Sequence, residues 1–336
     1  MKKTLFITLN ILFFMMTSCT KKSETYFESM NTFMKVQAYG EKAKEANAAA
    51  QKYIGELEKL ISVTKPESEI YKLNNSKTFP VKIKVEALDL IKTALDMAEK
   101  SDGAFNPCLY PVSSAWGFTK KQYRIPPAQE IAEKLLLCDW KKVRIEASDV
   151  YMEPGMAFDL GGIGKGFAGD EAAKKMREFG IKSALLDLGG NIQLIGKKPD
   201  GSDWTIGIKN PFDKNSSVGT LKANDVAIIT SAGYERYFEG PDGHKYIHIF
   251  DGTTGCPVEN DLVSTTAIAK SGTYCDGLST TLYVLGLEKS IAFWKRNPNF
   301  DFIIITKDRQ IYITKKIAKK FTMNGDLNGF AVSVVK

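Results

Sequence analysis

A strand-like segment gives way to a helix-like one at Asp159-Leu160-Gly161-Gly162-Ile163-Gly164-Lys165-Gly166-Phe167-Ala168-Gly169-Asp170. Glycine has no Cβ to hold a ligand away, so the backbone of such a turn can lie directly against a phosphate or a metal. Consecutive backbone amides can bind oxyanions, and Lys165 adds a mobile positive charge. The glycine spacing matches neither the P-loop pattern GxxxxGK[ST] nor the dinucleotide fingerprint GxGxxG. By itself the stretch fits an anion site and a tight structural turn equally well.

Helical and strand-like patterns alternate on both sides of this turn. Apolar residues recur at helical spacing in 43–61 and 85–100, and further helices are expected at 276–285 and 287–296. Short strand patterns, separated by Gly, Asp and Pro turns, occupy 183–188, 191–196, 204–209, 225–230, 246–250, 263–269, 302–306 and 311–314. No linker, low-complexity stretch or internal repeat divides the chain. The pattern predicts one layered α+β body whose strands form a meander rather than βαβ repeats.

The N-terminus has the form of a bacterial lipoprotein signal. A short basic start, Met1-Lys2-Lys3, precedes an apolar stretch over 5–16. This stretch ends in Met16-Thr17-Ser18-Cys19, with Met16 where Leu is more usual. The apolar stretch is short for a membrane-spanning helix, so an uncleaved anchor with an incidental cysteine is only the alternative.

This pattern divides the chain into three parts. We predict a signal peptide over 1–18, a lipidated tether over 19–25 and a folded domain over 26–336. Cys19 would carry the lipid and attach the mature protein to a bilayer. The protein is therefore expected to be an exported lipoprotein, anchored on the periplasmic or another extracytoplasmic face of a membrane.

Charge and cysteine usage argue against two classes of function. Without Lys2 and Lys3 the formal net charge falls from +7 to +5, charges of both signs are interleaved, and no nucleic-acid partner is expected. The chain has two histidines and its cysteines form no CxxC pair, which argues against a zinc site. Free, mostly buried thiols are favoured over disulfides at Cys108, Cys138, Cys256 and Cys275.

A second group of polar residues lies in Cys275-Asp276-Gly277-Leu278-Ser279-Thr280-Thr281. On a helix, residues four apart lie one above the other, so the Asp276 carboxylate and the Thr280 hydroxyl would share a face. Oxygen ligands on one face suit Mg²⁺, which commonly takes one or two protein side chains and completes its shell with water and phosphate oxygens. Alternatively, Asp276 is an N-cap and Thr280 bonds back to a helix carbonyl.

A third group lies in Tyr246-Ile247-His248-Ile249-Phe250-Asp251-Gly252-Thr253-Thr254-Gly255, a strand pattern that ends in a polar turn. His248 and Asp251 are candidates for a site at this turn, and histidine is the natural base near neutral pH. His244 follows the turn residues Pro241-Asp242-Gly243, where an exposed structural role is expected. The alternative for His248 is a partly buried structural histidine.

Taken in order, several segments resemble the ApbE family, the FAD:protein FMN transferases. The resemblance covers most of the exported chain. The matching segments are Lys65-Pro66-Glu67-Ser68-Glu69-Ile70-Tyr71-Lys72-Leu73-Asn74, Ser101-Asp102-Gly103-Ala104-Phe105-Asn106-Pro107 with Trp116-Gly117-Phe118, the stretch from Asp159 to Asp170, Asp187-Leu188-Gly189-Gly190-Asn191, Thr230-Ser231-Ala232-Gly233-Tyr234-Glu235-Arg236-Tyr237, the His248 strand and the Asp276 helix.

The resemblance implies a T-fold-related body with antiparallel and mixed sheets, and a specific reaction. Family members use Mg²⁺ to split FAD at its diphosphate and attach FMN to a threonine of a partner protein, releasing AMP. Asp276 and Thr280 match the metal side chains, Gly162 matches a carbonyl ligand, and His248, with Asp251 beside it, matches the catalytic base. The positions that match the FAD-lining residues are Met30, Ala104, Phe105, Asn106, Asp159, Lys165 and Phe250.

The resemblance also implies the class of acceptor protein. Such an acceptor would carry an exported Asp-(Ser/Thr)-x-(Ser/Thr)-Gly-Ala-(Ser/Thr)-like motif. Subunits of ion-translocating NADH:quinone or Rnf-type complexes are examples.

The chain departs from the family pattern at three places. Thr64 stands where an aromatic Tyr is common, Asn106 replaces the usual Asp, and Gly252-Thr253 replaces the usual Pro-Arg. Without an aromatic cover at position 64, water could reach the phosphorus more easily. Two alternatives to transfer therefore stay open: a Mg²⁺-dependent FAD pyrophosphatase that yields FMN and AMP, and a flavin-binding lipoprotein without chemistry.

Overall fold

A nine-stranded sheet forms the centre of the computed structural model, which describes residues 21–241, 243–325, 327 and 329–336. The strand order is β1 (Lys22–Ser29), β2 (Thr32–Tyr39), β6 (Ser183–Asp187), β7 (Asn191–Ile195), β10 (Ala227–Ala232), β13 (Leu262–Ala269), β14 (Asp301–Thr306), β15 (Gln310–Thr314) and β17 (Ala331–Val335). Neighbouring strands are antiparallel except β15 and β17, which run parallel. Sequential strands are mostly neighbours, so the predicted meander and the α+β class are confirmed.

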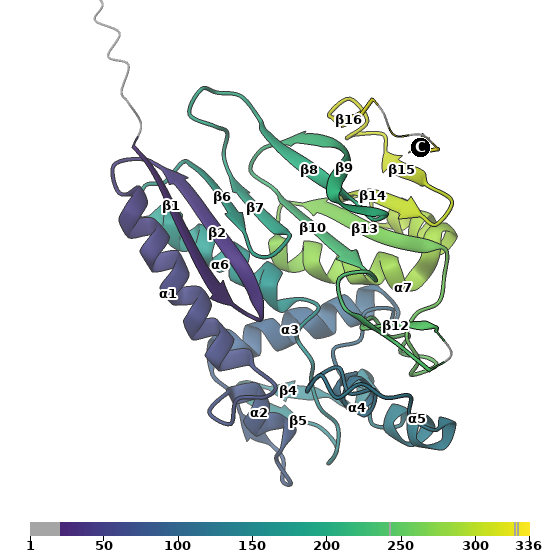
Figure 1. Cartoon of the computed structure of the whole chain (residues 1–336). Coiled ribbons are helices and arrows are strands. Elements are labelled where there is room, and N and C mark those ends of the chain that lie inside the picture. The colour runs from purple at the N-terminus through teal and green to yellow at the C-terminus, as the bar shows by residue number, and fades with distance from the viewer. Residues whose placement is uncertain (1–20, 242, 326, 328) are drawn as a thin grey trace, which may run out of the picture.

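Three helices cover one face of this sheet (Figure 1): α1 (Ala43–Ile61), α6 (Gly164–Glu178) and α7 (Gly272–Arg296). The alternation of β2 points Met34, Val36 and Ala38 into one core cluster with α1 and α6, and all three side chains are fully buried. A fourth helix, α3 (Val85–Lys100), packs on α7. The stretch from Asp159 to Gly166, called the glycine turn below, runs into the start of α6, and Asp276 lies in α7, so this helical layer positions the candidate site.

The opposite face is covered by a smaller three-stranded sheet of β8 (Trp204–Asn210), β9 (Asp213–Ala223) and β16 (Phe321–Met323). Strands buried on both faces need apolar residues at successive positions, which accounts for the run Phe302-Ile303-Ile304-Ile305 in β14. The centre of the large sheet is therefore a rigid support for α6 and α7.

The remaining elements lie mostly beyond the edge of the helical layer (Figure 1). They are α2 (Glu69–Asn74), β3 (Val81–Lys82), α4 (Tyr110–Ala115), α5 (Ala128–Leu135), the 3₁₀ turn η1 (Trp140–Lys142), β4 (Arg144–Glu146), β5 (Asp149–Tyr151) and the hairpin of β11 (Tyr237–Glu239) and β12 (Lys245–Ile247). The chain passes through most of this region between α1 and α6. It supplies the loops that contain Phe105 and Asp159.

The backbones of α6 and α7 touch where the two helices meet. A Cβ at Gly166 would lie 2.1 Å from the carbonyl oxygen of Gly272, and a Cβ at Gly272 would lie 2.8 Å from that of Gly166. Asp170, one turn further along α6, accepts hydrogen bonds from the N–H groups of Gly272 (2.6 Å) and Thr273 (2.9 Å). A carboxylate at a helix N-terminus pairs with free amides and with the helix dipole, so Asp170 fixes the start of α7 against α6.

Most predicted elements are confirmed, with three differences. The helices over 43–61 and 85–100 match α1 and α3, and Gly286 (φ 72°, ψ 175°) kinks α7 between its two predicted parts. The helix begins earlier than predicted because Ser271 caps it through Tyr274 N–H (3.2 Å). The strand predicted over 246–250 is wrong in its second half, since the chain turns back after it and Phe250 forms only an isolated bridge with Pro257.

The third difference is at the N-terminus. A tether was predicted through residue 25, but β1 begins at Lys22 and pairs along its length with β2. One face of this hairpin is exposed, so its sequence looks as polar as a linker. The predicted signal peptide and Cys19 lie outside the described residues.

Two further observations concern membranes and thiols. Within the described residues, no helix combines the length and hydrophobicity that a bilayer crossing requires. Cys108, Cys138 and Cys275 are buried free thiols and Cys256 is a partly exposed one, which confirms the prediction of free cysteines. Burial raises the pKa of each buried thiol, so none is a reactive thiolate at neutral pH.

The close contact between α6 and α7 predicts that adding a methyl group at Gly166 destabilises the protein. Gly166→Ala is expected to lower the free energy of unfolding by about 1–3 kcal/mol, because backbone atoms that cannot rotate away occupy the space of the new Cβ. Gly55→Ala in α1 is the matched control: its Cβ would meet nothing within 4 Å, so it should stabilise the helix by about 0.5–1 kcal/mol. Urea unfolding measures both, and equal effects would contradict the proposed backbone contact.

Candidate active site

Asp276 lies on the second turn of α7, where its side chain is only 5% exposed. Its Oδ2 accepts a hydrogen bond from Gly166 N–H at the start of α6 (2.8 Å). Burial raises the pKa of Asp276, although the positive charge of Lys165 and the Gly166 amide favour its charged form. The alternative in which Asp276 is the N-cap is wrong, because Ser271 occupies that position.

Thr280 lies one turn after Asp276, on a side of α7 that meets both β10 and the glycine turn. Its Oγ1 is 3.3 Å from Ser231 Oγ. A Cβ at Gly162 would lie 3.6 Å from Thr280 Oγ1 and 3.1 Å from a ring carbon of Phe105. The structure thus brings Gly162, Thr280 and Phe105 together, two of the expected metal positions and one expected flavin position.

This group of atoms fits Mg²⁺ better than a transition metal. Within the described residues there is no cluster of three or more His, Cys, Asp or Glu side chains that could hold a metal. No lysine or arginine of the described part forms an ion pair with the buried Asp276. A buried carboxylate without a counter-ion in the described part, one helix turn from a hydroxyl that lies against Gly162, supplies oxygen donors that suit a hard cation.

The glycines of the turn serve close packing more than anion binding. Gly162, Gly164 and Gly166 all have negative φ, and a Cβ at each would press on Phe105, Ile61 or Gly272. Several of the amides in the turn already donate within the protein: Gly161 N–H to Asp159 Oδ1, Ile163 and Gly164 N–H to Leu160, and Gly166 N–H to Asp276. Most of the amides that were expected to bind an anion therefore donate to groups of the protein itself. Lys165 is the main positive group of the turn.

His248 is held in one tautomer. Its Nδ1 lies 3.0 Å from the carbonyl oxygen of Arg236, and the same oxygen accepts its backbone N–H at 3.1 Å. A carbonyl can only accept, so Nδ1 carries the proton and Nε2 keeps its lone pair. Burial, with the positive charges of Arg236 and Lys165, lowers the pKa of His248 to about 4. At neutral pH the ring is thus a neutral acceptor.

Within the described residues, Asp251 forms no hydrogen bond or ion pair with His248. Its Oδ1 accepts hydrogen bonds from the N–H (2.7 Å) and hydroxyl (2.6 Å) of Thr253, and its carbonyl accepts the Gly255 N–H. These bonds close the turn after the His248 strand. The observed partner of His248 is the Arg236 carbonyl, a group that sequence analysis did not identify.

Phe250 points into an aromatic cluster. It is 5% exposed and packs on Trp116 (centroids 6.2 Å apart) and Phe118 (5.6 Å). Phe118 also lies 6.5 Å from the His248 ring. This cluster packs against the segment that contains His248 and Phe250, and it encloses most of the Phe250 ring.

Both polar atoms of the Asn106 side chain form hydrogen bonds within the protein. Its Nδ2 donates to the Cys138 carbonyl (2.9 Å) and its Oδ1 accepts the Cys108 N–H (2.8 Å). An ionised aspartate could accept the second bond but not donate the first. A Cβ at Gly252 would lie 3.4 Å from Asn106 Nδ2, so two of the three departures from the family pattern are neighbours in space.

The other predicted flavin positions border the same region. Asp159 N–H donates to the Pro107 carbonyl (2.7 Å), which joins the turn to the loop that contains Ala104 and Phe105. That loop is held by the Phe105 N–H, which donates to Ser101 Oγ (3.0 Å).

Met30 lies at the tip of the β1–β2 hairpin, and Glu58 of α1 connects this tip to the loop before α2. The Glu58 carboxylate accepts from Met30 N–H (3.0 Å) and Ser29 Oγ (2.6 Å) and pairs with Lys65 Nζ (2.7 Å). Burial opposes its charge, but these bonds prevail and lower the pKa of Glu58 to about 2. Thr64, beside Lys65, is exposed and bonds only to Ser62 in this loop.

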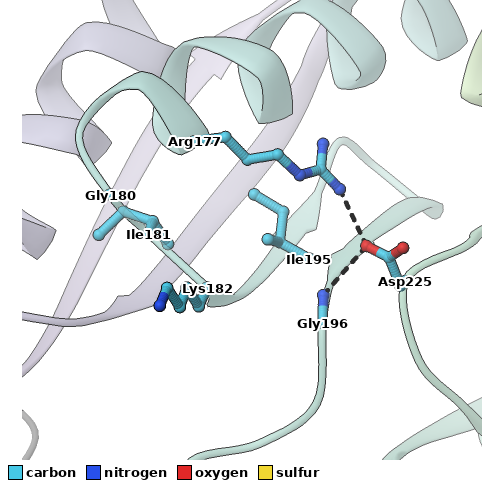
Figure 2. Close-up of a pocket in the computed structure, with 7 residues that line it drawn as sticks. All are labelled: Arg177, Gly180, Ile181, Lys182, Ile195, Gly196 and Asp225. Atoms are coloured by element: carbon cyan, nitrogen blue, oxygen red, sulfur yellow. Dashed lines mark hydrogen bonds and ion pairs between the residues drawn. The ribbon is translucent and has the colours of Figure 1, made fainter.

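A cavity of about 500 Å³ lies elsewhere, between the end of α6 and strands β6, β7 and β10 (Figure 2). It contains none of the predicted site residues. Its most prominent polar group, Asp225, is already held by Arg177 (2.9 Å), Lys270 (3.1 Å) and Gly196 N–H (3.2 Å). These contacts connect α6 to the sheet and leave no free charge on Asp225 for a ligand.

Comparison with known proteins gives matches over most of the chain. The ApbE family model matches residues 30–304. The chain is 33% identical over 270 residues to an FAD:protein FMN transferase of Klebsiella pneumoniae, covering 79% of this chain and 83% of that protein. It is 32% identical over 304 residues to one of Treponema pallidum, covering 84% of each. The crystal structure of the ApbE protein of Thermotoga maritima superposes with a TM-score of 0.84 at 29% identity, covering 89% of this chain and 99% of that one.

The hydrogen bonding of His248 predicts its titration. In NMR spectra of ¹⁵N-labelled protein, His248 should titrate near pH 4 and carry its proton on Nδ1 at pH 7, because burial and two nearby cations disfavour the imidazolium form. A His248→Gln variant assigns the resonance. A pKa of 6.5 or higher would contradict the effect of burial and of the two cations, and a proton on Nε2 would contradict the hydrogen bond to the Arg236 carbonyl.

Proposed function

Because this chain belongs to the ApbE family, we propose that it transfers FMN from FAD to a threonine hydroxyl of an exported or membrane redox protein, releasing AMP, with Mg²⁺ as cofactor. The observation that supports this most is the buried Asp276 carboxylate, which has no ion-pair partner in the described part of the chain and adjoins the glycine turn with Lys165. A diphosphate and a hard cation need such a combination of charges.

Asp276, the Thr280 hydroxyl and the Gly162 carbonyl would hold the metal, with water and diphosphate oxygens as its other ligands. Bound Mg²⁺ would supply neutralisation of the diphosphate charge and stabilise AMP as it leaves. Asp276 supplies the only negative charge of this set. Lys165 would contribute a second positive charge to the same phosphates.

The flavin nucleotide would lie between the loops that meet at Gly162. Met30, Ala104, Phe105, Asn106, Asp159, Lys165 and Phe250 are the proposed FAD-lining residues. The hydrogen bonds that join these loops support the proposal, because they hold the substrate walls rigid before binding. The Phe250 ring packs on other aromatic rings and the Asn106 side chain is hydrogen-bonded within the protein. These two residues would therefore contact FAD through their backbone or, for Phe250, through a ring edge.

His248 is the proposed general base. Its Nε2 would take the proton of the acceptor threonine while the threonine oxygen attacks the phosphorus of the FMN half. The new bond joins that oxygen to phosphorus, and the bond between the phosphorus and the bridging oxygen of the diphosphate breaks, so AMP leaves with the electron pair. Asp251 would act by shaping the turn behind His248 rather than by taking the proton.

The place of reaction is proposed from the sequence of the N-terminus alone. We propose that Cys19 carries lipid and that the protein acts on the extracytoplasmic face of a membrane. Since β1 begins at Lys22, only two residues would separate the lipidated cysteine from the sheet. The acceptor would be a membrane-associated subunit with the motif Asp-(Ser/Thr)-x-(Ser/Thr)-Gly-Ala-(Ser/Thr), of the ion-translocating NADH:quinone or Rnf type.

Hydrolysis of FAD to FMN and AMP is the second candidate. The same groups would serve it, with water in place of the threonine. The observation that favours it is the exposed Thr64, a side chain too small to cover a flavin.

The metal site predicts a charge-specific effect. Asp276→Asn keeps the shape and the bond from Gly166 but removes the charge, so Mg²⁺ should raise the melting temperature of the wild type and not of this variant. Without metal the variant should be at least as stable as the wild type, because burial disfavours the Asp276 charge. Thr280→Val should weaken Mg²⁺ binding less, since water can replace a neutral ligand. An unchanged response to Mg²⁺ in Asp276→Asn would remove this residue from the site.

The proposed base gives the test of the whole reaction. Wild-type protein with FAD, Mg²⁺ and a peptide that bears the acceptor motif should yield the FMN-modified peptide, detected by mass, and AMP. His248→Asn should bind FAD as before but transfer FMN at least roughly a hundredfold more slowly. If the variant loses FAD affinity and keeps its turnover rate, His248 binds substrate and is not the base. No peptide modification by the wild type, with FMN released instead, would favour the pyrophosphatase.

Position 64 predicts the balance between transfer and hydrolysis. Thr64→Tyr could stack on the isoalloxazine ring, which contributes about 1 kcal/mol beyond area burial, so FAD should bind several-fold more tightly. The ratio of free FMN to peptide-bound FMN should fall, because an aromatic cover excludes water. Thr64→Val, which adds no ring, is the control. An unchanged ratio and an unchanged FAD dissociation constant would show that position 64 does not face the flavin.

A further inference from the structure

Asn191 lies between two charged groups of the site. It begins β7, and its side chain is 3% exposed. Its Oδ1 accepts a hydrogen bond from Lys165 Nζ at 3.1 Å. An ammonium can only donate, so the atom that faces Lys165 must be the oxygen and the amide nitrogen must face the other way.

That amide nitrogen is buried and has no hydrogen-bond partner within the described residues. The Asn191 side chain nevertheless faces Asp276. The residue after Lys165 is bound to the same carboxylate, because the Gly166 N–H donates to Asp276 Oδ2 (2.8 Å). Asn191 therefore presents its negative end to Lys165 and its positive end to Asp276. This arrangement separates a cation from an anion that would otherwise attract each other.

A direct Lys165–Asp276 ion pair would be the simpler outcome in so buried a place, because Coulomb attraction is strong at low dielectric. No such pair occurs in the described structure, although Lys165 is near enough for its positive charge to stabilise the charged Asp276 carboxylate. A direct pair would occupy carboxylate oxygens that a metal needs and would neutralise the cation that a phosphate needs. The site would then be closed to both.

The backbone around Asn191 is fixed firmly enough for this role. The Leu188 N–H donates to its carbonyl (3.0 Å), and the Gly190 N–H donates to Asp187 Oδ1 (2.8 Å) in the preceding turn. Gly189 has φ 71°, and a Cβ there would lie 2.1 Å from Thr32 Oγ1. The stretch Asp187-Leu188-Gly189-Gly190-Asn191 thus has a structural reason to keep its glycines.

We propose that Asn191 is a positioning residue that binds the Lys165 ammonium and so keeps the Asp276 carboxylate open to a divalent cation. This inference rests on the proposed metal site at Asp276. It assigns a role to a side chain that touches neither metal nor flavin.

Calorimetric titration of the FAD-free protein with Mg²⁺ tests this inference without any activity measurement. Asn191→Leu, of similar size, is expected to weaken Mg²⁺ binding roughly tenfold or more, the scale for losing a residue that supports a metal ligand. Adding Lys165→Met to this variant should restore the affinity to about that of the Lys165→Met single variant, because the competing cation is gone. A merely structural role for Asn191 would give no such rescue.

Asn191→Asp covers the case in which the leucine variant does not fold. It keeps an oxygen for Lys165 and places a second carboxylate oxygen toward Asp276, a negative charge that a divalent cation neutralises, so Mg²⁺ affinity should not fall. A tenfold loss in Asn191→Asp, unchanged affinity in Asn191→Leu, or a double variant as weak as Asn191→Leu would each overturn the proposal. Asp276→Asn in the same titration separates the two hypotheses: if it still binds Mg²⁺, the metal site itself is wrong; if it does not, any failure concerns Asn191 alone.

Discussion

The contact of backbone on backbone between α6 and α7 is the constraint on which the site depends. Gly166 and Gly272 allow it, and Asp170 fixes it by capping α7 with a carboxylate from α6. The same contact brings the Gly166 amide to Asp276 at 2.8 Å. One local requirement, the absence of two Cβ atoms, therefore sets the distance between the glycine turn and the buried carboxylate.

The site keeps its charges apart at a cost in stability. A buried carboxylate with no counter-ion in the described structure disfavours folding, and the raised pKa of Asp276 expresses this. Two amides, from Gly166 and Asn191, moderate the cost without neutralising the charge. His248 is likewise kept neutral, since burial and then the positive charges of Arg236 and Lys165 lower its pKa, while the Arg236 carbonyl sets the tautomer. A cation and a polyanionic nucleotide together would satisfy these groups.

Periodicity predicted most of the fold, because α1, α3 and the central strands have strong patterns of 3.6 or 2. The β1–β2 hairpin was missed, since its exposed face gives it the composition of a linker. In the site, the placement of Asp276 and Thr280 one turn apart on one helix could be predicted, because their spacing is local. Asn191, Glu58 and the Arg236 carbonyl were missed, because each acts through a contact between different elements of the chain. The glycines of the turn were identified, but their role as packing contacts required the partner helix.

The central claim is that a metal binds where α7 meets the glycine turn. Anomalous diffraction from a crystal grown with FAD and Mn²⁺, a scattering substitute for Mg²⁺, tests it most directly. The predicted result is a single strong peak coordinated by an Asp276 oxygen, Thr280 Oγ1 and the Gly162 carbonyl, with diphosphate oxygens completing the shell. A peak elsewhere, with Asp276 paired to Lys165 instead, would contradict the account.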